Sequence, residues 1–129
     1  MSFRRYILEI GSGIDLHGED ETKAAQRAVR NAIGHVSMIG LRQLFHVSSF
    51  QELEKALMVD VTIATPNPDK VDGEAVLSIL PEGNRRINVV EGGLRFPAPS
   101  TAEEASTNGI VVAIAVIVVL VDVSKLGKA

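Results

Sequence analysis

The segment Glu9–Gly18 (EIGSGIDLHG), continued by Asp20–Lys23 (DETK), is the stretch around which the rest of the chain is organised. It follows the apolar residues Tyr6–Leu8 and precedes a run with helical spacing, so it joins a strand to a helix. Glycine permits a positive φ, or the close approach of another backbone, at Gly11 and Gly13. The junction concentrates glycines, a carboxylate, an imidazole and an ammonium group, and it is the first place to look for a functional site.

Asp15 and His17 point to the same face of any strand that continues past Ile14, because side chains alternate along a strand. A carboxylate beside an imidazole orients the ring for proton transfer or for metal binding. The pair therefore indicates a site with one titratable base.

The helix after the loop adds positive charge to this region. Lys23 and Arg27 are four residues apart and share one helix face. Either Asp20 or Thr22 can cap the helix, and the N–H groups of a helix N-terminus attract anions. A small anionic ligand is the class that these groups favour.

A purely structural interpretation competes with this one. A glycine-rich turn with a capping aspartate is common between a strand and a helix, and an Asp-x-His pair is more often solvated than catalytic. The dinucleotide-binding pattern G-x-G-x-x-G fails because Gly18 comes two positions too late, and a Gly-x-x-x-x-Gly-Lys-Ser/Thr loop is absent. Both nucleotide-binding motifs are set aside.

The pattern G-x-G-x-D-x-H-G at Gly11–Gly18, followed by Asp20–Ala25 and Arg27–Ile33, resembles the signature of a small family of conserved hypothetical proteins. That family occurs in bacteria and, with an N-terminal extension, in plants. The resemblance continues through three further segments, Gly40–Arg42, Pro66–Asp72 and Glu91–Leu94. Because the family has no established activity, the resemblance guides the choice of site residues and says little about the reaction.

The composition favours one soluble globular domain over residues 1–129. The chain is 46% hydrophobic and 22% charged, with a formal net charge of −3 and no cysteine. Mild acidity without a Lys/Arg cluster argues against nucleic-acid binding, and the absence of cysteine excludes disulfides and thiolate metal sites. Met1–Arg5 does not lead into a long apolar segment, so a signal peptide is not expected and the cytoplasm is the default location.

Hydrophobic periodicity predicts the order β-α-β-α-β-β, an α+β fold with a four-stranded mixed sheet and helices on one face. The strands are expected at about 5–16, 57–65, 86–90 and 110–121, and the helices at 22–34 and 73–80. Residues 37–45 are expected to be a short helical or extended piece, and residues 49–53 one helical turn. The order resembles that of bacterial chorismate mutases and small trimeric deaminases, with a ferredoxin-like sandwich as the alternative.

The apolar run Ile110–Val121 is too short to cross a membrane, which takes roughly 18 or more residues. It fits a strand buried on both faces, although the expected helices cover only one of them. We therefore expect a closed homo-oligomer, with a trimer favoured by the resemblance, and the Gly11–Gly18 loop at or near a subunit boundary. The expected partners are a small anionic molecule and further copies of the chain, with neither nucleic acid nor membrane.

Three functional hypotheses follow from these observations. The first is an enzyme or binding protein that uses the Asp/His loop on a small anionic or cyclic amide ligand. The second is a metal site in which Asp15 and His17 supply two ligands and Glu9, Glu91 or a second subunit supplies a third. The third is a non-catalytic metabolite-binding or structural oligomeric module. The cofactor is unknown. The candidate catalytic residues are Asp15, His17 and Lys23, and the candidate ligand-binding residues are Gly11, Gly13, Gly18, Arg27 and Arg42.

Overall fold

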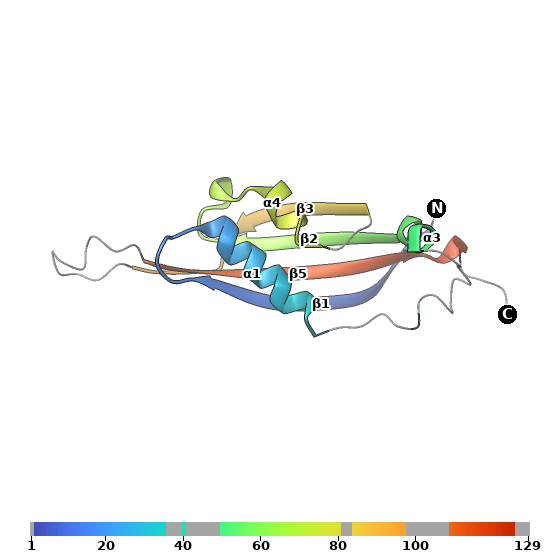
Figure 1. Ribbon diagram of the computed structural model, residues 1–129, viewed down its shortest axis with the longest axis horizontal. Helices are drawn as coiled ribbons and strands as arrows, with labels where there is room; N and C mark the ends of the chain where they lie inside the picture. Colours follow the sequence, from blue (N-terminus) through green and yellow to red (C-terminus); the bar gives the residue numbers. More distant parts are fainter. Residues whose placement is uncertain (1, 36–39, 41–49, 81–83, 98–108, 126–129) are drawn as a thin grey trace.

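The computed structural model describes residues 2–35, 40, 50–80, 84–97 and 109–125. The elements in chain order are β1 (Phe3–Asp15), α1 (Glu21–Ile33), α3 (Phe50–Lys55), β2 (Leu57–Thr65), η1 (Pro68–Lys70), α4 (Gly73–Leu77), β3 (Asn84–Glu91), β4 (Leu94–Phe96), β5 (Ile110–Asp122) and η3 (Val123–Lys125). Figure 1 shows an elongated molecule in which α1 runs across the long strands β1 and β5.

The strands form one mixed sheet in the order β1-β5-β2-β3, with β4 paired to β5. β1 runs antiparallel to β5 along its whole length, from Phe3 opposite Asp122 to Asp15 opposite Val111. β2 pairs antiparallel with β5 and parallel with β3. The last long strand therefore lies in the middle of the sheet, between the first and second strands.

Capping residues that can be recognised in the sequence set both ends of helix α1. The side chain of Asp20 accepts a hydrogen bond from the backbone N–H of Lys23 at 3.0 Å, a cap that contributes about 1 kcal/mol. Ala24, Ala25, Ala28, Val29 and Ala32 form its buried stripe, and Gly34 caps its end. Small side chains let the helix lie close to the sheet.

The core lies between the sheet and the two helices α1 and α4, on one face of the sheet. Val61, Ile63 and Ile117 are fully buried there, and Val76 of α4 packs into the same cluster. The predicted α+β fold with helices on one face is confirmed. The sheet has five strands rather than four, because the three residues of β4 after Gly92 and Gly93 pair with the start of β5. Gly93 has a φ of 69°, which glycine adopts without strain.

The opposite face of the sheet carries apolar side chains that no described helix covers. Strand register places Ile10 opposite Val116 and Leu94 opposite Val112 on this side. The apolar side chains of β1, β4 and β5 that point away from α1 are called the open face: Leu8, Ile10, Ile14, Leu94, Phe96, Val112, Ile114, Val116 and Val118. Within one chain β5 is thus buried on its helix side, whereas Ile114 on the other side is 39% exposed. No helix in the described ranges is long and apolar enough to span a bilayer.

Candidate functional site

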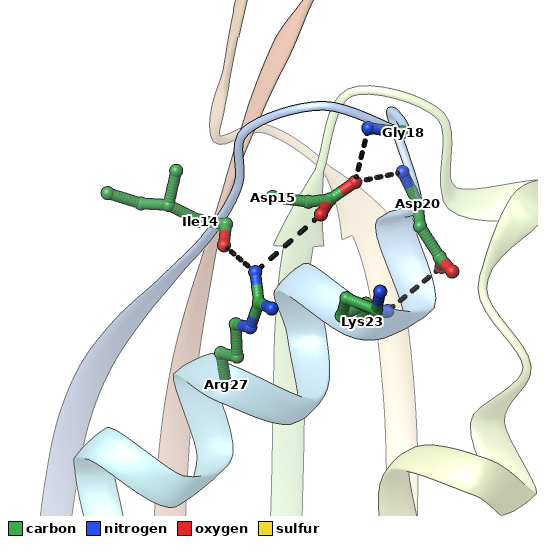
Figure 2. Close-up of polar contacts among 6 residues, drawn as sticks. All are labelled: Ile14, Asp15, Gly18, Asp20, Lys23 and Arg27. Atoms are coloured by element: carbon green, nitrogen blue, oxygen red, sulfur yellow. Dashed lines mark hydrogen bonds and ion pairs between the residues drawn. The ribbon is translucent and has the colours of Figure 1, made fainter.

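Asp15, the last residue of β1, holds the loop that leads into α1. Its Oδ2 accepts hydrogen bonds from the backbone N–H of Gly18 at 3.1 Å and of Asp20 at 2.8 Å (Figure 2). The residue is only 6% exposed. Hydrogen bonds from backbone N–H groups to a buried carboxylate are strong, so Asp15 fixes the shape of the loop.

Arg27 binds the same carboxylate from the helix side. Its Nη1 lies 3.6 Å from Oδ1 of Asp15 and donates a 2.6 Å hydrogen bond to the backbone carbonyl of Ile14. Figure 2 shows the guanidinium lying between the helix and the end of the strand. Both oxygens of Asp15 therefore have partners inside the chain.

Gly11 and Gly13 lie in β1 directly beneath α1. A Cβ at Gly11 would fall 2.4 Å from the backbone nitrogen of Ala32, and one at Gly13 would fall 2.1 Å from the carbonyl oxygen of Ala24. Of the two roles that the sequence left open for these glycines, close approach of another backbone is the one found. That backbone belongs to α1 of the same chain.

His17 and Lys23 are both exposed to solvent. β1 ends at Asp15, so the alternation that would place His17 beside Asp15 does not extend to the loop: Asp15 is buried and His17 is exposed. Within the described ranges, neither the His17 ring nor the Lys23 ammonium group has a hydrogen-bond or ion-pair partner. Gly18 contributes its backbone N–H to the loop, whereas Arg42 lies outside the described residues.

Metal binding requires several ligands converging on one point. Among the described residues, no three His, Asp or Glu side chains lie close enough together to hold an ion. Glu91 is exposed at the end of β3. Glu9 is buried on the helix side of β1, and burial raises the pKa of its carboxyl group.

Two further acidic residues, Glu19 and Glu21, fix this end of the molecule through contacts that were not predicted from the sequence. Oε1 of Glu21 accepts hydrogen bonds from Oγ1 of Thr65 at 2.7 Å and from the backbone N–H of Asn67 at 2.6 Å. Arg95 of β4 forms an ion pair with Glu19, which has a positive φ of 47°. The loop is thus tied to the ends of β2 and β4. Of these contacts, only that of Glu21 has a signal in the sequence, because an acidic residue in the first turn of a helix is favoured there. This signal does not indicate which residue Glu21 contacts.

Comparison with known proteins places the chain among proteins without an assigned activity. A family model described as a conserved hypothetical protein, Lin0512_fam, matches residues 5–119. The chain is also similar to the crystal structure of an FtsZ-like protein of unknown function from Nostoc punctiforme PCC 73102, at 35% identity and a TM-score of 0.79. That match covers 95% of this chain and 98% of the other. No curated protein matches the sequence at a significant level.

Proposed function

The chain belongs to the Lin0512 family of conserved hypothetical proteins, and we propose that it acts as a non-catalytic module that assembles with further copies of itself through the open face. The single observation that carries this proposal is the apolar surface of the sheet opposite α1. Six large side chains of the open face are between 39% and 63% exposed: Leu8, Ile10, Ile14, Leu94, Phe96 and Ile114.

The extent of this surface supports an interface. A half-exposed large side chain presents about 100 Å². The open face therefore presents about 600–800 Å², at or above the largest apolar patch of a typical monomer. A standard interface buries about 800 Å² per partner, so the area suffices for a specific assembly.

The distribution of polar groups supports the same interpretation. Beside the apolar area, on the β2 and β3 side of the sheet, Arg86 donates to Asp60 at 3.1 Å. Thr62 and Asn88 lie next to that pair in the strand register. Polar groups beside an apolar centre are typical of a protein–protein interface, and here they lie along the β2 and β3 side.

The contacts of Asp15 disfavour the catalytic hypothesis. In a carboxylate–histidine pair the acid faces the ring, but Asp15 is buried with its Oδ2 bound to two backbone N–H groups of the loop, whereas His17 is exposed and has no partner within the described residues. Asp15 is therefore better explained as part of the frame of the strand-to-helix junction.

A closed oligomer, with a trimer favoured, remains the assembly that we propose. Ile14 belongs to the open face and Leu16, two residues later, is 53% exposed. A second copy seated on this face would bring the neighbouring loop, with His17 and Gly18, to the subunit boundary. The proposed boundary thus coincides with the family signature.

The test is the molar mass in solution by size-exclusion chromatography with light scattering. We expect wild type to have the mass of several chains at micromolar concentration and Ile10→Lys to have the mass of one chain. Asn88→Lys is the matched control, because it adds the same charge to an exposed position on the polar side of the same sheet face. Far-ultraviolet circular dichroism checks that each variant is folded. A wild type that stays monomeric at these concentrations refutes the proposal.

A small anion held beside this boundary is a second proposal, favoured by the His17 ring and the Lys23 ammonium group, which are exposed and have no partner among the residues that the structure describes. Inorganic phosphate and small carboxylates, screened by thermal shift, are the probes. Stabilisation of wild type that disappears in both His17→Ala and Lys23→Ala would support it. Equal shifts in wild type and both variants would exclude these residues as ligands.

A further inference from the structure

Strand β1 is an edge strand of the sheet: within the described ranges, β5 pairs with one side of its backbone and no strand pairs with the other. Such an edge offers N–H and C=O groups to any other extended chain, and natural proteins protect these groups. The edge of β1 is long, and alternate side chains along it, such as Leu8 and Ile10, are apolar. It therefore needs protection more than a short polar edge would.

Two side chains of α1 reach the outward backbone groups of this strand. Oδ1 of Asn31 accepts a hydrogen bond from the backbone N–H of Ser12 at 3.1 Å, and Nη1 of Arg27 donates to the carbonyl of Ile14 at 2.6 Å. Because Ser12 and Ile14 are two residues apart, these groups lie on the same side of the strand. Asn31 and Arg27 thus occupy positions that an added strand would need.

The close packing of α1 makes this reach possible. Ala28 and Ala32 lie against the backbone at Gly11 and Gly13, so the helix axis is near the strand. Arg27 and Asn31 are each one residue before those alanines and so lie on the adjoining flank of the helix. An asparagine side chain is short, and it spans the remaining distance only because the glycines bring the helix close.

We infer that Arg27 and Asn31 guard the β1 edge and prevent β1 of a second copy from adding to it as a further strand. At the other end of β1, the register shifts between Arg5 and Ile7, and irregular pairing also discourages strand addition. A second copy is the relevant occupant because an edge can pair with itself about a two-fold axis. The inference does not rest on assembly through the open face, which uses side chains rather than backbone groups.

The test compares Arg27→Ala/Asn31→Ala with Arg30→Ala, an exposed arginine of the same helix without a side-chain contact to β1 among the described residues. All variants also carry Phe96→Lys, which charges the open face at β4 to block association there and adds no lysine to the β1 edge. We expect the double variant to scatter light and to bind thioflavin T, whereas Arg30→Ala stays like its parent. A folded double variant that does neither overturns the inference.

A second measurement keeps the test decisive if the double variant unfolds. Hydrogen exchange at the Ser12 amide should be about tenfold faster in Asn31→Ala, as expected for loss of one hydrogen bond. Asn31→Asp keeps an oxygen acceptor for Ser12 and should retain the protection and the low light scattering. Equal exchange and equal scattering in Asn31→Ala and Asn31→Asp would contradict the role of the side-chain acceptor.

Discussion

Replacing Gly13 by alanine separates a structural role for the glycines of β1 from a role in ligand binding. The added Cβ would fall 2.1 Å from the carbonyl oxygen of Ala24 and 2.3 Å from the backbone nitrogen of Ala28. Both atoms belong to the backbone of α1, so no side chain can rotate out of the way. The helix itself has to move.

The size of the effect follows from these distances. Ordinary contact begins at 3.4 Å, so α1 has to retreat by about 1.3 Å, the difference between 3.4 and 2.1 Å. Protein interiors are close-packed, and such a shift separates the alanine stripe of α1 from the sheet along its length. Overpacking costs about 1–3 kcal/mol and more where the backbone is involved, so we expect a loss of about 3 kcal/mol or more. That is a large part of a typical total stability of about 5–15 kcal/mol.

Thermal and urea denaturation measure this loss, and Gly18→Ala is the control. A Cβ at Gly18 would lie 3.2 Å from Oδ2 of Asp15, so this side chain has to shift by only a few tenths of an ångström. We expect the melting temperature to fall by about 10 °C or more for Gly13→Ala and by only a few degrees for Gly18→Ala. A Gly13→Ala protein that melts within about 2 °C of wild type would refute the packing argument.

Three further substitutions test buried carboxylates, each by denaturation. Glu9→Gln should raise the free energy of unfolding at pH 7, because burial raises the pKa of Glu9 and makes its ionised form costly in the folded protein. This gain should fade as the pH falls through the raised pKa, where wild-type Glu9 takes up a proton. A gain that persists unchanged in acid would contradict the reasoning. Asp122→Asn should lower stability at neutral pH, because hydrogen bonds from the Ser124 hydroxyl and then the Ser2 N–H lower the pKa of Asp122. The stabilisation by Asp122 is present above its ordinary value of 3.8 and is lost as the pH falls through the lowered pKa, so a variant with the same acid unfolding curve as wild type would count against it. Glu21→Ala should cost about 2–4 kcal/mol by leaving the Thr65 hydroxyl unpaired at 0% exposure, and a loss below 1 kcal/mol would mean that water replaces the carboxylate.

Periodicity was sufficient to predict most of the fold. The alternation in Leu57–Thr65 matches β2, and the helical stripe of alanines locates α1 to within a residue at each end. These patterns are local, because each follows from which face of one element meets the core. The prediction of an α+β layer with helices on one face succeeded for that reason.

The candidate site was harder to predict because its meaning depends on contacts between distant residues. The sequence shows that Gly11 and Gly13 permit a close approach, but only the register of β1 beneath α1 identifies the helix as the approaching group. The expected pairing of Asp15 with His17 assumed that the strand continues. Asp15 ends the strand instead, because its carboxylate binds the N–H groups of the turn that follows.

The position of β5 has a consequence for how the chain acquires its structure. β5 is made after the other strands, yet it separates β1 from β2 in the finished sheet, and its partners in β1 lie about a hundred residues earlier. Loop closure over such a distance is entropically costly, so sheets of this topology fold slowly. Until β5 inserts, the apolar strands β1 and β2 have no common neighbour and expose unpaired edges. We therefore expect the nascent chain to be most prone to aggregation just before β5 leaves the ribosome.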